Sequence, residues 1–341
     1  MSIKQVLTYN KRMYILGIES SCDDTGLAIV NSRGEVIEHV TSSQHEIHAK
    51  YGGIVPELAS RDHVKKFIPL LQELFVKSSK NLNDIDIIAF TNGPGLLGPL
   101  LAGASLSKAL GWCNDIPTIE VNHLEAHIYS PMITEPELKA PFVSLLVSGG
   151  HTILSLVDKN LKITTLGSTL DDSAGECFDK VARKLNLGYP GGPAIAKKAE
   201  LAKDYNFNFP RPMQNSDDFN FSFSGLKTHV INEINKILLT EDDVNNISCE
   251  LQNAIVDTLI KKSVKASQQY KIKNIVITGG VSANTKLRDE FSSVKEIKAF
   301  FPDVKFSTDN GAMIAYAGFL KSKSGKTRDN FKIKPNPSLS L

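Results

Sequence analysis

Residues 14–40, YILGIESSCDDTGLAIVNSRGEVIEHV, contain three short apolar stretches separated by two polar turns. Apolar runs of this length, bounded by Ser, Asp, Asn and Gly, are typical of strands joined by tight turns. The same pattern returns about 128 residues later in residues 141–166, PFVSLLVSGGHTILSLVDKNLKITTL. Two β-meanders at this distance indicate an internal duplication.

Each meander is followed by a strand, a glycine-containing turn and a helix. Residues 85–90 lead into Asn92-Gly93-Pro94-Gly95 and an expected helix, and residues 275–278 lead into Gly279-Gly280 and another. Strands that alternate with helices in both halves predict an α/β fold with two lobes. We expect an extension at 1–12, an N-terminal lobe at 13–140, a C-terminal lobe at 141–320 and a solvated basic tail at 321–341.

The composition is that of an ordinary globular protein. The 341 residues include 39 Lys and Arg against 37 Asp and Glu, for a net charge of +2, so no overall charge attracts nucleic acid or membrane. The four cysteines form no CxxC pair, which favours a reducing, cytoplasmic location. The uncharged run 87–107 contains six Gly and Pro residues, so we interpret it as buried strand, turn and helix rather than a membrane span.

The segment His123-Leu124-Glu125-Ala126-His127 follows a strand-like run. In a helix the two histidines would share one face and could bind one metal ion, but a pair of helix-surface histidines fits the spacing as well. Glu125 would lie about 200° around the helix from His123, so it is badly placed to activate a metal-bound water. The metallopeptidase interpretation is therefore weak.

Asp309 and Asn310 precede an expected helix over 312–320, where either residue could serve as the N-cap. A carboxylate added to the two imidazoles would instead complete an N,N,O ligand set suited to Fe(II) or Zn(II). The sequence alone does not show whether Asp309 lies near the two histidines.

Three glycine turns, at 93–95, 149–150 and 279–280, follow expected strands. Such turns allow close backbone approach by an anion and suggest a nucleotide cleft, although a simple turn explains each one separately. Ser224 and Lys227 match the S-x-x-K pattern of acyl-enzyme serines, but the companion motifs are missing. His45, His48 and His63 are expected on loops or helix surfaces, and Asp23 and Asp24 are turn formers or cleft residues.

Ten ordered motifs between residues 14 and 319 together resemble the bacterial type of the universal tRNA N6-adenosine threonylcarbamoyltransferase family. They are ILGIESSCDDTGLAIV, YGGIVPELASRDH, TNGPGLLGPLLAG, NHLEAH, LLVSGGHT, DDSAGECFDKVARKLNLGYPGGP, FPRPM, FSFSGLKT, ITGGVSAN and STDNGAMIAYAG. The resemblance implies the duplicated fold shared by actin, sugar kinases and heat-shock chaperones, with two lobes around a nucleotide cleft. It also implies transfer of threonylcarbamoyl from threonylcarbamoyl-AMP to the adenosine 3′ of the anticodon, in tRNAs that read codons starting with A.

By the same resemblance, one divalent metal, with Fe(II) favoured over Zn(II), is bound by His123, His127 and Asp309. The adenylate substrate is expected on Leu146, Val147, Ser148, Gly149, Gly150, Asp179, Gly192 and Asn284, and Asp23 is expected to be catalytic or to lie near the phosphate. Asn122 departs from the family motif, which often has a second histidine there, and this could alter the surroundings of the metal.

The partners that the resemblance implies are tRNA, a catalytically silent homologous subunit, a small P-loop ATPase and the synthase that makes threonylcarbamoyl-AMP; no membrane is expected. Two alternatives remain on sequence grounds. One is a non-catalytic partner paralogue, which would be expected to lack the metal set, and the other is an ATP-dependent kinase-like enzyme on the same fold.

Overall fold

The computed structural model describes residues 13–203, 206–323, 325 and 332–341. The expected extension at 1–12 lies outside these residues. The chain divides into two compact units. The first takes in the described parts of Met1–Gln44, Pro56–Ala126 and Asn310–Ser340, and the second takes in His45–Val55, His127–Asp309 and Leu341.

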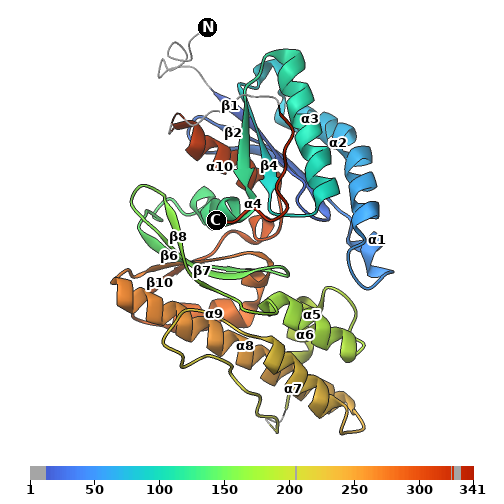
Figure 1. The fold of residues 1–341 in the computed structure, drawn as a ribbon, viewed down its shortest axis with the longest axis vertical. Helices are drawn as coiled ribbons and strands as arrows, with labels where there is room; N and C mark the ends of the chain where they lie inside the picture. The colour runs from blue at the N-terminus through green and yellow to red at the C-terminus, as the bar shows by residue number, and fades with distance from the viewer. Residues whose placement is uncertain (1–12, 204–205, 324, 326–331) are drawn as a thin grey trace. The chain divides into compact units, whose positions relative to one another are not determined.

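The first unit is built on a five-stranded sheet with the order β3-β2-β1-β4-β5; strands β1, β2 and β4 are labelled in Figure 1. The first three strands form the expected antiparallel meander, and β4 and β5 continue the sheet in parallel with β1. The bounds are β1 Tyr14–Glu19, β2 Asp24–Asn31, β3 Val36–Ser43, β4 Ile87–Gly93 and β5 Thr118–Asn122.

Both faces of this sheet are covered by helices. On one face, Leu16 and Ile18 pack into a core with Phe67 and Leu74. On the other, an added Cβ on Gly17 would lie 2.4 Å from the backbone nitrogen of Ala315, so only glycine permits this close helix–strand contact. The covering helices are α2 Pro56–Ser78, α3 Leu97–Asn114 and α10 Gly311–Lys323 (Figure 1).

The second unit repeats the sheet. Its order is β10-β9-β6-β7-β8; read from the opposite edge, as β8-β7-β6-β9-β10, it is the first order with each strand replaced by its counterpart, and the parallel and antiparallel pairings also correspond. The internal duplication expected from the two meanders is therefore confirmed. The strands are β6 Phe142–Val147, β7 Thr152–Val157, β8 Ile163–Ser168, β9 Asn274–Thr278 and β10 Lys298–Phe300.

The helices of the second unit pack against this sheet and against one another around a core that includes Phe178, Phe223 and Leu251. They are α5 Ala174–Lys184, α6 Gly191–Ala199, α7 Ser224–Ile234, α8 Glu241–Tyr270 and α9 Thr285–Ser293; the short helix α1 His45–Ala49 is also assigned to this unit. Helix α4 His123–Tyr129 joins the units, and short 3-10 turns lie at η2 Leu82–Asp84, η3 Ser130–Ile133, η4 Gly280–Ala283 and η5 Val304–Phe306.

The structure divides the chain differently from the boundaries expected at residues 140 and 320. Helix α10 returns to the first unit because Gly17 and Gly26 let it approach that sheet, and residues 45–55 belong to the second unit. The described end of the tail is not simply solvated. The Asn336 N–H donates to the Asn92 carbonyl at 2.7 Å, and the Gly95 N–H donates to the Pro337 carbonyl at 3.1 Å.

The uncharged run 87–107 forms β4, a turn and most of α3, as expected. Among the helices in the described parts of the chain, none has both the length and the apolar character needed to cross a membrane.

Candidate functional site

Helix α4 carries both candidate histidines and starts directly from the end of strand β5. The side-chain oxygen of Asn122 accepts hydrogen bonds from the N–H groups of Leu124 at 2.9 Å and Glu125 at 3.2 Å. Asn122 is therefore the N-cap of α4. Its amide also donates to the Ser340 carbonyl at 2.8 Å, so the departure from the family motif ties this helix to the C-terminal tail.

The two candidate N-cap residues before α10 have different contacts. The Asn310 side chain accepts from the Met313 N–H at 2.9 Å, which caps the helix. Asp309 instead contacts His127, with 2.9 Å between Oδ1 and Nε2. The sequence left this choice open, and the structure assigns the cap to Asn310.

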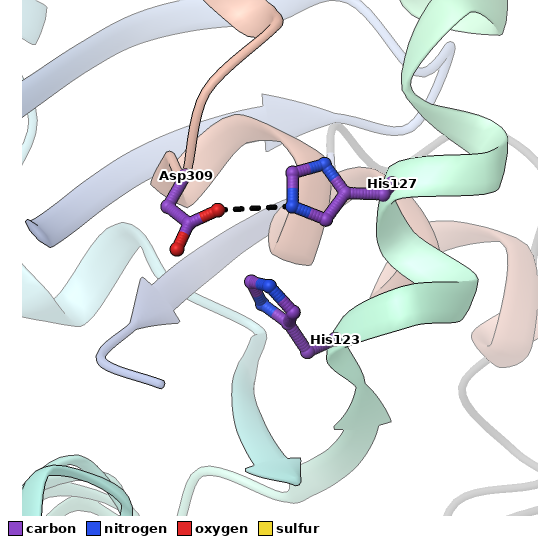
Figure 2. A group of neighbouring side chains, drawn as sticks. All are labelled: His123, His127 and Asp309. Carbon is purple, nitrogen blue, oxygen red and sulfur yellow. Dashed lines mark hydrogen bonds and ion pairs between the residues drawn. The ribbon is translucent and has the colours of Figure 1, made fainter. Parts of the chain in front are cut away.

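His123, His127 and Asp309 form one cluster (Figure 2). Each offers one ligand atom, and these atoms all lie within 4.8 Å of one another. The histidines are nearly buried, at 8% and 2% exposure, whereas the Asp309 side chain is 23% exposed. Two imidazole nitrogens and a carboxylate oxygen fit a divalent transition metal that keeps open positions.

The neighbouring Glu125 does not belong to this cluster. Its carboxylate forms an ion pair with Lys321 at 2.8 Å. The expected placement on another face of the helix is thus confirmed, and the weak metallopeptidase interpretation gains no support.

Sequence reasoning missed Glu19, which lies against His123. Its Oε2 atom is 3.1 Å from the Nδ1 atom of His123, and its side chain is fully buried. The available signal was a charged residue directly after the apolar stretch 14–18. Charged side chains are rarely buried without partners, which marks such a position for attention.

The expected adenylate residues Leu146 to Gly150 lie at the carboxyl end of β6 and in the turn that follows. The Ser148 N–H donates to the His151 carbonyl at 2.8 Å, and the Ser173 hydroxyl donates to the Gly149 carbonyl at 2.6 Å. A Cβ added to Gly149 or Gly150 would meet nothing within 4 Å. Hydrogen bonds from the protein therefore hold this turn, while the side of Gly149 and Gly150 where a Cβ would lie is open, as binding of an anion requires.

Two further elements adjoin this turn within the second unit. A Cβ on Gly175, in the first turn of α5, would lie 2.5 Å from the Ser148 carbonyl oxygen, and one on Gly279 would lie 2.5 Å from that of Val147. The start of α5 and the glycine turn after β9 thus meet at the end of β6. We call the open surface of Gly149 and Gly150, where added Cβ atoms meet nothing within 4 Å, the glycine cradle; added Cβ atoms on Gly192 and Gly280 also meet nothing within 4 Å.

Asp179 joins α5 to the start of α6. Burial raises the pKa of its carboxyl group, and the N–H of Gly191, which donates to Oδ1 at 2.7 Å, opposes this shift. Asp179 therefore positions the backbone at Gly191 and Gly192. Whether it also contacts a substrate stays a prediction.

Asn284 caps α9, since its side-chain oxygen accepts from the Leu287 N–H at 3.0 Å. Its amide donates to the Gln252 side chain at 2.8 Å. Both ends of this amide thus bond within the protein, so its expected role in reading ribose or base stays a prediction.

Asp23 lies half-buried in the turn between β1 and β2, and its carbonyl accepts from the Gln44 N–H at 3.2 Å. The expectation of surface positions is wrong for His48 and His63, which are fully buried. His63 bridges the Asp23 turn: its Nε2 lies 3.0 Å from the Cys22 carbonyl and its Nδ1 lies 2.7 Å from the Thr25 hydroxyl. His63 is buried because both ring nitrogens form hydrogen bonds within the protein.

The S-x-x-K segment has a structural explanation. The Ser224 hydroxyl donates to Asp171 at 2.7 Å, and Lys227 forms an ion pair with Asp172, also at 2.7 Å. Among the described residues no hydrogen bond joins Ser224 to Lys227, so an acyl-enzyme serine gains no support.

A family model described as tRNA N6-adenosine threonylcarbamoyltransferase matches residues 35–316. Curated relatives with this name include one from Ralstonia pickettii (strain 12J), 46% identical with 91% of each chain covered. Another, from Herminiimonas arsenicoxydans, is 46% identical and covers 95% of this chain and 97% of its own. A third, from Nitrosospira multiformis, is 45% identical, with 93% and 94% covered.

Solved structures share the fold at low identity. Component A of the Acidaminococcus fermentans (R)-2-hydroxyglutaryl-CoA dehydratase is similar with a TM-score of 0.56 and 14% identity, covering 92% of this chain and 99% of its own. HypF from T. kodakarensis gives a TM-score of 0.64 and 13% identity, with 92% of this chain and 48% of its own covered. These likenesses concern the fold alone and agree with the duplicated actin-like and sugar-kinase-like architecture expected from the sequence.

Proposed function

The chain belongs to the tRNA N6-adenosine threonylcarbamoyltransferase family, and on this premise we propose the reaction in detail. The protein transfers a threonylcarbamoyl group from threonylcarbamoyl-AMP to N6 of the adenosine 3′ of the anticodon, in tRNAs that read codons starting with A. The observation that carries the proposal is the convergence of His123, His127 and Asp309 to within 4.8 Å in a chain of this family.

These three residues would hold one divalent ion, Fe(II) by preference or Zn(II). The donor set is uncharged at the imidazoles and anionic at Asp309, which suits either ion. When bound, the ion would orient the threonylcarbamoyl group and polarise its carbonyl.

The adenylate half of the donor would lie in the glycine cradle. The backbone of Gly149 and Gly150, just beyond the end of β6, can approach a phosphate closely because neither residue carries a side chain. Holding the donor in this way aligns its carbonyl for attack and retains AMP as it leaves.

The adenine amine is a poor nucleophile because its lone pair is delocalised into the ring. Its nitrogen attacks the donor carbonyl, the bond from this carbon to the phosphate oxygen breaks, AMP leaves, and one N6 proton is released. Asp23, in the turn after β1, is proposed to act on this proton or beside the phosphate. Because the target base lies in a single-stranded loop, it can reach a site without disruption of a duplex.

A net charge of only +2 supports modest or shared affinity for tRNA. From the family resemblance we also propose that a homologous silent subunit and a small P-loop ATPase assist this protein and that a separate synthase supplies threonylcarbamoyl-AMP. The cysteine pattern supports a reaction in the cytoplasm.

The test is a single-turnover assay with purified protein, threonylcarbamoyl-AMP and unmodified tRNA, read by mass spectrometry of the digested nucleosides. The candidate partner subunits are supplied in parallel reactions. His127→Ala and Asp309→Ala should lose bound metal and most of the product. Glu125→Gln, on the same helix as His127 but paired with Lys321, is the matched control and should retain both. Full product formation by an Asp309→Ala protein without metal would refute the proposed role of the cluster.

A further inference from the structure

Glu19 is a buried carboxylate that accepts hydrogen bonds from two neighbouring residues. Its Oε1 atom accepts from the Ser21 N–H at 2.5 Å, and its Oε2 atom accepts from the Thr91 hydroxyl at 2.6 Å. The third neighbour is the Nδ1 atom of His123, 3.1 Å from Oε2. All of these residues belong to the first unit, so the arrangement is fixed within one compact part of the chain.

An ionised carboxylate has no proton to donate, so Glu19 is the acceptor in each of its hydrogen bonds. His123 must therefore donate from Nδ1 to Oε2. A neutral imidazole carries one proton, so donation from Nδ1 places the lone pair on Nε2. The Ser21 hydroxyl, 3.1 Å from the same Nδ1, is close enough to accept a share of this bond.

We propose that Glu19 is a positioning residue that fixes the tautomer and the ring orientation of His123, so that Nε2 is presented to the metal ion. The inference rests on the proposed metal site. A carboxylate behind a metal-binding histidine also raises the basicity of the ligand nitrogen. Thr91, in strand β4, and Ser21, after strand β1, in turn hold Glu19 between neighbouring parallel strands.

The first experiment measures metal affinity and the spectrum of bound Co(II) in the full chain. Glu19→Gln preserves the size of the side chain but removes its charge and turns one acceptor atom into a donor. We expect affinity for Co(II) and Zn(II) to fall about 10- to 100-fold, the usual effect of losing such a partner. The visible absorption bands of bound Co(II) should also shift, because the ligand field that His123 contributes would change.

Glu125→Gln is the matched control, because it removes a carboxylate from the helix that carries His123 without touching the cluster. Its affinity and spectrum should equal those of the unsubstituted protein. His127→Ala separates the two proposals. If it does not reduce metal binding, the metal site itself is wrong; if it does, but Glu19→Gln binds normally, only the role of Glu19 is overturned.

The second experiment needs no substitution and so does not depend on whether Glu19→Gln folds. Selective ¹⁵N labelling of the eight histidines allows the tautomer of His123 to be determined from its ring nitrogen shifts in metal-free protein at alkaline pH. The expected result is protonation at Nδ1, the less common form in solution. Protonation at Nε2 would overturn the proposal.

Discussion

The Nε2 atom of His127 lies 2.9 Å from Oδ1 of Asp309, across 182 positions of sequence. The contact arises because Asp309 directly precedes the cap of α10, while His127 lies in the last turn of α4. A cap residue is held firmly by the helix it begins, so its neighbour is also placed with little freedom.

Asp309→Asn should abolish stabilisation of the protein by a divalent ion. A ligand that binds only the folded state at 100 times its dissociation constant stabilises it by about 2.7 kcal/mol. We expect Zn(II) to raise the melting temperature of the unsubstituted protein and to leave that of Asp309→Asn nearly unchanged. Equal increases in the two proteins would show that Asp309 is not a ligand.

Gly279→Ala should destabilise the second unit. Gly279 has a φ of +88°, and an added Cβ would lie 2.5 Å from the Val147 carbonyl oxygen. The conformational strain alone is about 1–3 kcal/mol. The matched control is Gly280→Ala, where the Cβ meets nothing within 4 Å, with an expected change below about 0.5 kcal/mol. Denaturant unfolding of both variants checks this, and equal stability would contradict it.

Gly149→Leu should block the donor without unfolding the protein. The added side chain would enter open space in the glycine cradle, so the free energy of unfolding should change by less than about 0.5 kcal/mol. The KM for threonylcarbamoyl-AMP should rise about tenfold or more, because a phosphate could no longer approach the backbone. Gly225→Leu, where the added Cβ also meets open space but outside the cradle, should leave KM unchanged.

Because His63 is buried, the free energy of unfolding should decrease as the pH falls into the mildly acidic range. Burial is the largest influence and lowers the pKa of this histidine, while the Cys22 carbonyl and the carboxylates of Glu19, Asp62 and Asp23 oppose the shift. Because the folded pKa lies below the unfolded value of about 6.5, the unfolded chain takes up the proton first as pH falls. Stability is therefore complete above about pH 6.5 and declines below it.

The measurement is the free energy of unfolding of the unsubstituted protein and of His63→Gln between neutral and mildly acidic pH. The variant should be less stable at neutral pH and should show a shallower decline. If the free energies of unfolding of the two proteins change with pH in the same way, His63 does not contribute to the pH dependence of stability.

Asn122→Asp should test the contact between α4 and the tail. Aspartate keeps an oxygen that can cap the helix but cannot donate to the Ser340 carbonyl. We expect a loss of about 0.5–1.5 kcal/mol from this bond, and a further loss of about 1 kcal/mol in Asn122→Ala, which also removes the cap. If Asn122→Asp unfolds like the unsubstituted protein, the tail contact contributes nothing to stability.

Most of the fold was predictable from local patterns. The three apolar stretches of residues 14–40 and their repeat at 141–166 became two meanders, and the uncharged run 87–107 became strand, turn and helix, because hydrophobic period and turn residues act over a few positions. The boundaries of the units were not predictable. The placement of α10 depends on Gly17 and Gly26, whose lack of a side chain matters only once the helix packs there.

The sequence by itself determined the duplicated α/β architecture, the helical spacing that puts His123 and His127 on one face, and the motifs that carry the family resemblance. Only the tertiary structure decided that Asn310 rather than Asp309 caps α10, that Asp309 contacts His127, and that Glu19 lies behind His123. The physical reason is that spacing along a helix or strand follows from backbone geometry alone. Contacts between residues distant in the sequence depend instead on how the sheets and helices pack.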